Sequence, residues 1–226
     1  MTVRDLQFKG AAYKIWCVET ISQHPTWFSF EDEASVRDSM WDVKPGDVVL
    51  DVGAAYGSYA LTALASGADF VHAWSPQGFS GEETEAEVLK KSLDLNGWSD
   101  RCSVRGDGAY SRVGWLNADT QEFTESEPSP MGANVIKVQT LDGWASGEDL
   151  TRVDWMKLDV EGAEVDVLKG ADGIVRRFRP KILVENHLFK RATIADEVRG
   201  LLIPSGYREV ATVPYHSVSH SLYVPA

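Results

Sequence analysis

Short apolar runs alternate with amphipathic stretches along most of the chain, from residue 47 onward. Five of these runs are brief, rich in Val and bounded by Gly, Pro or Asp, which is the pattern of buried strands. The predicted strands are "DVVLDV" (47–52), "FVHAW" (70–74), "CSVR" (102–105), "WMKLDV" (155–160) and "KILVE" (181–185). Because helical patterns separate them, we expect a parallel sheet that helices cover on both faces.

The helical patterns lie at residues 80–97, 161–178 and 193–206. In the first of them, Ser80 and Glu83 have the spacing of a capping box, and Gly97 is placed to end the helix. The second carries acidic residues in its first turn and basic residues in its last, an order that the helix dipole favours.

The C-terminal end of the chain departs from this alternation. Residues 207–212 and 220–226 have the pattern of two strands joined by a short loop, which permits only antiparallel pairing. A further strand-like pair, residues 112–117 and 134–140, lies between the third and fourth predicted strands.

No repeat and no linker divides the chain, so we expect one domain over residues 1–226. Its core is expected over residues 46–226, and residues 1–45 are expected to form an N-terminal lid or cap. Three large aromatic residues of this segment, Trp16, Trp27 and Phe28, are candidates either for a lid over the acceptor or for core packing.

Composition adds limits on partners and location. The chain has 226 residues and a net charge of −12, and an acidic protein without a basic patch repels phosphate backbones, so no nucleic acid partner is expected. No segment approaches the ~20 apolar residues of a membrane span, and the N-terminus lacks a signal-peptide run. Cys17 and Cys102 lack a metal-ligand spacing and are expected to be reduced thiols. We therefore predict a cytoplasmic protein, and its oligomeric state stays open.

The stretch "VVLDVGAAYGSYAL" (48–61) ends a strand and opens a helix, which is where open α/β sheets bind ligands. Asp51 closes the strand, Gly53 allows a tight turn, and Gly57 lets the helix begin close to a ligand. The D-x-G-x-x-x-G spacing differs from the G-x-G-x-x-G of dinucleotide sites. An acid near the turn repels phosphate and attracts a cationic amine, which favours S-adenosylmethionine as the cofactor over NAD.

Together with "VQTLDGW" (138–144), "WMKLDVEGAEVDVLKGA" (155–171) and "RPKILVENH" (179–187), this turn carries a resemblance. The chain from about Lys44 onward resembles class I S-adenosylmethionine-dependent methyltransferases and, within them, the FkbM family. The resemblance implies an α/β Rossmann-like fold with a seven-stranded mixed sheet, an antiparallel last strand and helices on both faces. It also implies a methyltransferase (EC 2.1.1.-) that acts on a hydroxyl of a small metabolite, sugar or glycan.

One departure from the class concerns the ribose of the cofactor. An acid usually follows the second strand, commonly in A-F-E-P, whereas "AWSP" places Ser75 there. Losing a charged acceptor costs roughly 1.5–3 kcal/mol per hydrogen bond. Ser75 can still accept one bond, with Gln77, Glu82 or Glu83 as candidates to assist it. The alternative is an altered cofactor site.

The resemblance implies a set of cofactor-binding residues. They are Asp51, Gly53, Ala54, Gly57, Ser75, Asp107, Gly108, Ala109 and Asp159. Asp107 follows the third strand, where the class contacts adenine; it either accepts a bond from the adenine amino group or belongs to a surface turn. Asp142 either caps the residues that follow it or approaches the pocket.

Polar residues gather after the fourth and fifth predicted strands. Asp159 ends the fourth strand, and Glu185, Asn186 and His187 end the fifth, so in this fold their side chains are expected to meet at one edge of the cofactor pocket. In one mechanism His187, neutral at cytoplasmic pH, is the general base. In another, Asp159, Glu185 and Asn186 hold Mg²⁺, by analogy with catechol-type methyltransferases. In a third, these residues only position the acceptor.

A charged residue also lies within the fourth predicted strand. Lys157 alternates onto the same face as Asp159 and needs a carboxylate partner, Asp159 or Glu185, because an unpaired buried charge is costly. In the next segment, Glu161 and Glu164 are three positions apart; one is expected to face the substrate and the other to serve only the helix dipole.

Two functions other than O-methylation stay open. The first is a binding protein on the same scaffold that has lost catalysis, which Ser75 suggests. The second is an N-methyltransferase, because the fold hosts both chemistries.

Overall fold

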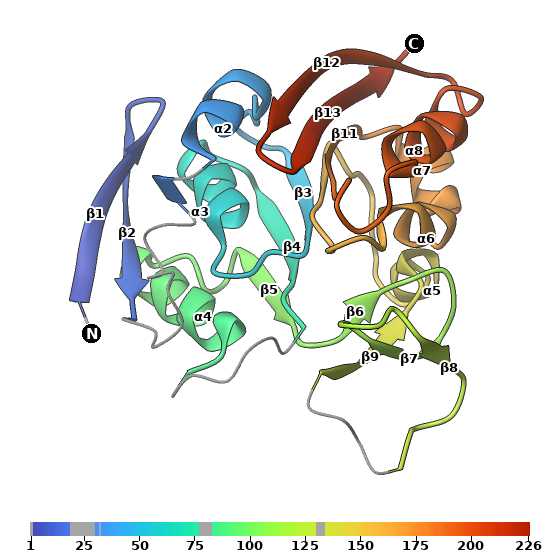
Figure 1. Cartoon of the computed structure of the whole chain (residues 1–226). Helices are drawn as coiled ribbons and strands as arrows, with labels where there is room; N and C mark the ends of the chain where they lie inside the picture. Colours follow the sequence, from blue (N-terminus) through green and yellow to red (C-terminus); the bar gives the residue numbers. More distant parts are fainter. Residues whose placement is uncertain (1, 19–29, 32, 77–82, 130–133) are drawn as a thin grey trace. The chain divides into compact units, whose positions relative to one another are not determined.

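The computed structural model of the chain describes residues 2–18, 30–31, 33–76, 83–129 and 134–226. The chain forms two compact units, Met1–Gly106 and Asp107–Ala226. Figure 1 shows the helices and strands of both units, coloured along the sequence.

Three parallel strands form the sheet of the first unit, in the order β3 (Val48–Val52), β4 (Phe70–Trp74) and β5 (Cys102–Arg105). All three coincide with predicted strands. Helix α3 (Ser58–Ala65) follows β3, and α4 (Glu85–Asn96) follows β4. Nearly every residue of β3 and most of β4 are buried, as expected of strands in a parallel sheet with covered faces.

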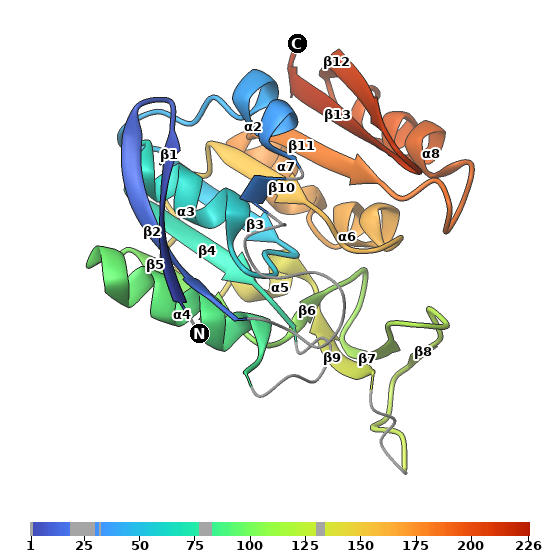
Figure 2. The same ribbon diagram turned by 60° about the vertical axis from the view of Figure 1, so that its left-hand side comes forward.

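The N-terminal residues form a hairpin that the sequence does not predict. Strand β1 (Thr2–Phe8) pairs antiparallel with β2 (Ala11–Cys17), and β2 lies along α4 (Figure 2). The backbone amide of Trp16 donates a hydrogen bond to Oγ of Ser92 on α4 at 2.9 Å. A short helix, α2 (Ala34–Met40), precedes β3.

The capping box of α4 lies one turn later than predicted. The amide of Glu87 donates to Oγ1 of Thr84 at 3.2 Å, and the amide of Thr84 donates to the carboxylate of Glu87 at 2.7 Å. The box is thus Thr84–Glu87 and not Ser80–Glu83; Ser80 lies outside the described residues. Gly97 ends the helix in a left-handed conformation, as predicted.

Four strands of the second unit pair with one another. Strand β10 (Trp155–Leu158) is parallel to β11 (Lys181–Asn186), and β13 (Val218–Pro225) pairs antiparallel with both β11 and β12 (Tyr207–Tyr215). Helix α8 (Ile194–Leu202) precedes this hairpin. With three parallel strands in the first unit and four mixed strands in the second, the described part of the chain has the strands of the predicted fold, including the antiparallel last one.

Two helices replace the single helix predicted over residues 161–178. They are α6 (Glu164–Lys169) and α7 (Asp172–Phe178). The break lies at Gly170, where an added Cβ would be 2.1 Å from the backbone oxygen of Tyr110. Only glycine allows this close approach between two segments, and the helical path ends there.

Asp142 caps the second of these helices. Its carboxylate accepts hydrogen bonds from the amides of Gly173 and Ile174, at 2.8 and 2.9 Å. The helix that contains Asp142, α5 (Leu141–Ala145), has Thr140 as its own cap. Asp142 is therefore a capping residue, but it caps α7 and not the residues that follow it.

A small sheet precedes α5. Its strands are β6 (Gly108–Ala109), β7 (Gly114–Asn117), β8 (Phe123–Thr124) and β9 (Val135–Gln139), in the order β6-β9-β7-β8. The antiparallel pairing of β7 with β9 confirms the predicted strand pair.

Cys17 and Cys102 are buried free thiols, as predicted. Burial, with a contribution from the charge of Asp51, raises the pKa of Cys102 to about 12, so this thiol stays protonated at neutral pH. None of the helices in the described segments combines the length and apolar character that crossing a bilayer requires.

Candidate functional site

The loop between β3 and α3 has a backbone that depends on its glycines. Gly53 and Gly57 have left-handed φ angles of 89° and 90°, and Ala55 between them has a φ of 46°. The amides of Gly53 and Ala54 both donate to the carbonyl of Trp74 at the end of β4, at 3.0 and 2.7 Å. The turn is thus fixed at the carboxyl ends of two neighbouring parallel strands, where open α/β sheets bind ligands.

Gly57 and Asp51 lie on either side of this turn. A Cβ added to Gly57 would be 2.3 Å from Cδ1 of Leu89 on α4, and the left-handed φ of 90° strains other residues, so this position favours glycine. Asp51 is 1% exposed and is therefore buried.

Ser75 immediately follows β4 and is also 1% exposed. Its hydroxyl donates to the carbonyl of Ala55 at 3.2 Å, and its amide donates to the carbonyl of Arg105 at 2.9 Å. The side chain at the position of the usual ribose acid therefore fastens β4 to the glycine turn. Its hydroxyl oxygen keeps acceptor capacity, and ribose binding by Ser75 stays a prediction.

Glu83, a candidate to assist Ser75, is held by other partners. Its carboxylate lies 2.6 Å from Nζ of Lys91 and accepts a hydrogen bond from Nε1 of Trp16 at 3.2 Å. The other candidates, Gln77 and Glu82 for the ribose and Trp27 and Phe28 for the lid, lie outside the described residues.

The predicted adenine-binding residues belong to the second unit. Gly108 and Ala109 form β6 and pair with Val138 and Gln139 of β9. The carboxylate of Asp107 accepts a hydrogen bond from the side chain of Gln139. These residues are therefore held by the small sheet, and their contact with adenine stays a prediction.

The predicted catalytic residues come together at the carboxyl ends of β10 and β11. Nζ of Lys157 lies 3.5 Å from Oδ2 of Asp159 and 3.5 Å from Oε2 of Glu185, and the side chain of Lys157 is fully buried. The predicted need of this lysine for a carboxylate partner is confirmed. Both candidate partners are present, so the buried ammonium is balanced by charge on two sides.

Glu185 also contacts a residue that the sequence does not single out. Nε2 of His220 lies 3.2 Å from Oε2 of Glu185, and the two residues face each other in the pairing of β11 with β13. Burial alone would raise the pKa of Glu185, but Lys157 and His220 outweigh it and hold the pKa well below its usual range. Glu185 is therefore an ionised residue that anchors its neighbours.

His187 lies between four carboxylates. Nδ1 is 2.6 Å from Oε1 of Glu164, and Nε2 lies 3.6, 3.7 and 3.8 Å from oxygens of Asp159, Glu161 and Glu185. The ring and Glu164 are buried, whereas the side chains of Asp159 and Glu161 are 27% and 66% exposed. Nδ1 of the ring thus faces a buried acid, whereas Nε2 faces acids that are partly exposed to solvent.

This setting changes the expected charge of His187. Burial alone lowers its pKa, but the hydrogen bond to Glu164 and the charges of Asp159 and Glu161 outweigh burial and raise the pKa to about 9. The neutral histidine expected at cytoplasmic pH is therefore wrong for this structure, because a solvated ring carries no such set of acids around it. The ring is predominantly an imidazolium at neutral pH.

Asn186 does not join Asp159 and Glu185 as the magnesium hypothesis requires. Successive residues of a strand point to opposite faces, so Asn186 lies on the other face of β11 from Glu185. Its amide nitrogen donates to the backbone oxygen and the hydroxyl of Ser219, and to the hydroxyl of Ser221, at 3.0–3.3 Å. The side chain thus fastens β13 to β11.

Two members of the cluster have roles that sequence reasoning missed. His220 requires knowledge of the register between β11 and β13, which the sequence does not specify. Glu164 was expected to serve the helix dipole or the substrate, and its contact with His187 joins residues 23 positions apart.

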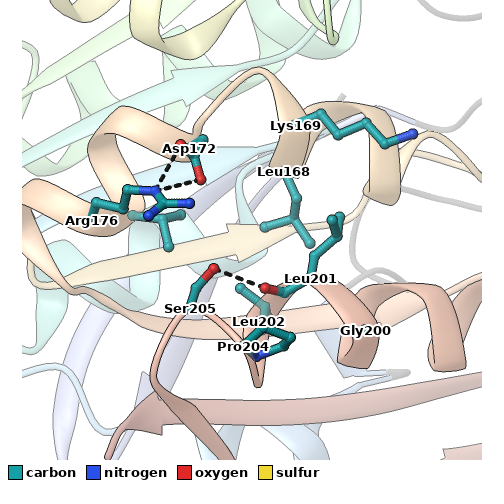
Figure 3. A pocket seen from close by; sticks show the side chains of 10 residues that line it. Leu168, Lys169, Asp172, Arg176, Gly200, Leu201, Leu202, Pro204 and Ser205 are labelled. Atoms are coloured by element: carbon teal, nitrogen blue, oxygen red, sulfur yellow. Dashed lines mark hydrogen bonds and ion pairs between the residues drawn. The ribbon is translucent and has the colours of Figure 1, made fainter.

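A separate groove in the second unit involves none of these residues. It has a volume of about 480 Å³ and lies between the end of α8 and helices α6 and α7 (Figure 3). Leu168, Leu202 and Pro204 line it, and the Asp172–Arg176 ion pair lies at its edge. Because it lacks the clustered acids and histidines, this groove is not a candidate for the chemistry.

Comparison with known proteins identifies a family and several similar folds. The methyltransferase FkbM domain matches residues 51–209. Methyltransferase FkbM from Methylobacillus flagellatus KT has 18% identity and a TM-score of 0.60, over 81% of this chain and 44% of that chain. Putative methyltransferase yhhF from Escherichia coli has 11% identity and a TM-score of 0.55, over 99% of both chains. A putative rRNA-methylase from Clostridium thermocellum has 9% identity and a TM-score of 0.52, over 84% of this chain and 91% of that chain. No curated protein matches.

These likenesses establish a class I S-adenosylmethionine-dependent methyltransferase fold, as predicted. Because the domain match extends over most of the residues, the chain belongs to the FkbM methyltransferase family. It spans less than half the length of the Methylobacillus protein. The absence of a nucleic acid partner stays a prediction, since one similar fold is that of a putative rRNA-methylase.

Proposed function

We propose that the protein methylates a hydroxyl oxygen of a small metabolite, sugar or glycan. The observation that supports this best is the position of His187, with Nδ1 fixed by a buried acid and Nε2 next to the partly exposed Asp159. A hydroxyl must lose its proton when its oxygen is methylated, and this cluster can accept one.

The glycine turn fits S-adenosylmethionine better than a dinucleotide. The left-handed Gly53 and Gly57 shape a turn with a buried acid, Asp51, at the end of the preceding strand, and a carboxylate suits a cationic amino acid group more than a pyrophosphate. When bound, the cofactor supplies a methyl group activated on a sulfonium. The residues proposed to hold it are Asp51, Gly53, Ala54, Gly57, Ser75, Asp107, Gly108, Ala109 and Asp159.

His187 is the proposed base, acting through Nε2. With Nδ1 bonded to Glu164, Nε2 is the ring nitrogen left to receive the proton of the acceptor hydroxyl. Asp159 is proposed to orient that hydroxyl, and Lys157 and Glu185 to hold Asp159 and the ring in place. Since the pKa of His187 is about 9, the active deprotonated form grows as pH rises, and the rate is expected to rise with it.

A base is preferred to magnesium because the side chain of Asn186 lies on the other face of β11 from Glu185, where its amide nitrogen donates to Ser219 and Ser221, and so cannot share one ion with Asp159 and Glu185. Dialysis of the full chain against a chelator is accordingly expected to leave methyl transfer unchanged. Loss of transfer that added Mg²⁺ restores would favour the metal mechanism instead.

The acceptor class is tested with S-adenosylmethionine carrying a labelled methyl group. The full chain is incubated with separate pools of hydroxylated metabolites, glycans, amines and RNA, and the labelled product is identified by mass. We expect the label on oxygen of a metabolite or glycan. Transfer only to nitrogen would support the N-methyltransferase alternative, and transfer only to RNA would contradict the proposed acceptor class.

A further inference from the structure

The contact between Glu164 and His187 is not explained by a gain in the stability of the fold. Oε1 of Glu164 lies 2.6 Å from Nδ1 of His187, and the side chain of Glu164 is fully buried. The other carboxylate oxygen, Oε2, is buried without a hydrogen-bond partner among the described residues. Burying a carboxylate with one oxygen unsatisfied is costly, so an apolar side chain would serve packing better here.

The loop before Glu164 is shaped to hold this carboxylate. Glu161 and Gly162 adopt left-handed φ angles of 53° and 104° in succession, and the amide of Gly162 donates to Oε1 of Glu164 at 3.1 Å. A left-handed conformation is unfavourable for a glutamate and persists where the surrounding structure requires it. The same oxygen that meets the histidine is therefore itself held by the backbone.

The two nitrogens of a neutral imidazole are not equivalent, because one carries the proton and the other offers a lone pair. A carboxylate can only accept, so the contact with Glu164 retains the proton on Nδ1. The lone pair then lies on Nε2, which faces the partly exposed Asp159 and Glu161.

We infer that Glu164 is a positioning residue that fixes the ring orientation and the Nδ1–H tautomer of His187, and so selects Nε2 as the atom offered to the acceptor. This inference rests on the proposed function for its catalytic meaning, but the tautomer is a property of the protein alone. In the triad of serine hydrolases a buried carboxylate orients a histidine by the same physical means.

Nitrogen-15 NMR of the full chain, labelled at its histidines, tests the inference. Spectra are recorded above the pKa of His187, where the neutral ring is present, and the His187 signals are assigned by their loss in His187→Gln. We expect Nδ1–H in the wild type and in Glu164→Gln, whose amide oxygen can still accept. In Glu164→Leu the tautomer ratio should shift toward Nε2–H by about tenfold or more, the effect of losing one hydrogen bond to a charged group.

Glu161→Leu is the matched control, because it removes a carboxylate 3.7 Å from the other nitrogen of the same ring. It should leave the Nδ1–H form dominant. Retention of Nδ1–H in Glu164→Leu, or an equal shift in Glu161→Leu, would overturn the inference. If circular dichroism shows that Glu164→Leu does not fold, Glu164→Met takes its place.

Calorimetric titration with S-adenosylhomocysteine separates this inference from the proposed function. We expect the wild type and the variants of Glu164 and Glu161 to bind it alike, because Glu164 and Glu161 are not among the proposed cofactor residues. An altered tautomer with unchanged binding supports the inference. Absence of binding in the wild type would count against the proposed function and leave the tautomer result standing.

Discussion

The ammonium of Lys157 and the carboxylate of Glu185 lie 3.5 Å apart on neighbouring parallel strands, with the lysine side chain fully buried. His220 approaches the same carboxylate from β13. The carboxylate of Glu185 therefore interacts with both Lys157 and His220. Asp159, which follows β10, is partly exposed. The cluster thus divides its acids into the buried anchors Glu164 and Glu185 and the more exposed Asp159 and Glu161.

Replacing Lys157 by Met tests the anchoring role. Glu185 and Asp159 then lose a buried cation, and breaking such a pair from one side costs about 3–5 kcal/mol of unfolding free energy. Because Lys157 lowers the pKa of Glu185, that pKa should rise. A carboxylate with a lowered pKa stabilises the fold above its unfolded pKa and loses this contribution on acidification, so the acid-unfolding midpoint should move to higher pH. Urea unfolding across acidic pH measures both effects.

Lys169→Met is the control for that variant, since Lys169 is exposed at the end of α6. A surface substitution of this kind should change stability by no more than about 0.5 kcal/mol. Equal losses in the two variants would contradict the anchoring role of Lys157.

The raised pKa of His187 predicts a stability that declines in alkaline solution. The folded pKa of about 9 exceeds the ordinary histidine pKa of 6.5, so the contribution is full below pH 6.5 and is lost as pH rises through 9. At about 1.4 kcal/mol per pH unit the total is roughly 3 kcal/mol. The measurement is the difference in unfolding free energy between wild type and His187→Gln, followed from neutral to alkaline pH.

Taking this difference removes the titration of other groups, which both proteins share. We expect it to shrink as pH rises through the folded pKa. A difference that stays constant over this range would show that His187 is not held as a cation.

Removal of the Asp142 carboxylate should weaken α7. Asp142→Ala leaves the amides of Gly173 and Ile174 without their acceptor, and loss of a cap costs about 0.5–2 kcal/mol. Asp172→Ala is the comparison, because Asp172 lies in the first turn of the same helix and its ion pair among the described residues is with the exposed Arg176. Thermal unfolding should rank Asp142→Ala as clearly the less stable, and the reverse order would refute the cap.

Strand positions follow closely from the sequence, because short runs such as residues 70–74 and 102–105 are bounded by residues that end strands. Helix limits follow less well where tertiary contacts decide them. Gly170 carries no signal of its own among helix-forming neighbours, yet its contact with the backbone of Tyr110 divides one predicted helix into two. The cap that Asp142 provides for α7 likewise depends on a contact between segments that are distant in the sequence.

Most members of the candidate site were predictable from the sequence, but His220 and the charge state of the site were not. The pattern places Glu185 near the end of β11 and His187 directly after it, two positions apart, and this much the sequence supplies. The contact of His187 with Glu164 and that of Glu185 with His220 depend on register and helix placement. Since the pKa of His187 results from these contacts, no local pattern indicates it.

Gly57→Ala should destabilise the first unit through a specific clash. The added methyl group would lie 2.3 Å from Leu89, and overpacking of this kind costs about 1–3 kcal/mol beyond the strain of the left-handed backbone. Gly97→Ala is matched, since Gly97 also has a left-handed φ but has open space around it. Chemical unfolding should show the larger loss for Gly57→Ala; equal losses would mean that the backbone angle alone matters.

The central claim is that the turn from Asp51 to Gly57 holds the methyl donor. Calorimetric titration of S-adenosylhomocysteine into the folded full chain tests it most directly. We predict saturable one-to-one binding that weakens by about tenfold or more in Gly57→Ala and is unchanged in Gly97→Ala. A wild type that releases no heat of binding, or a folded Gly57→Ala that binds as tightly as the wild type, would contradict the claim.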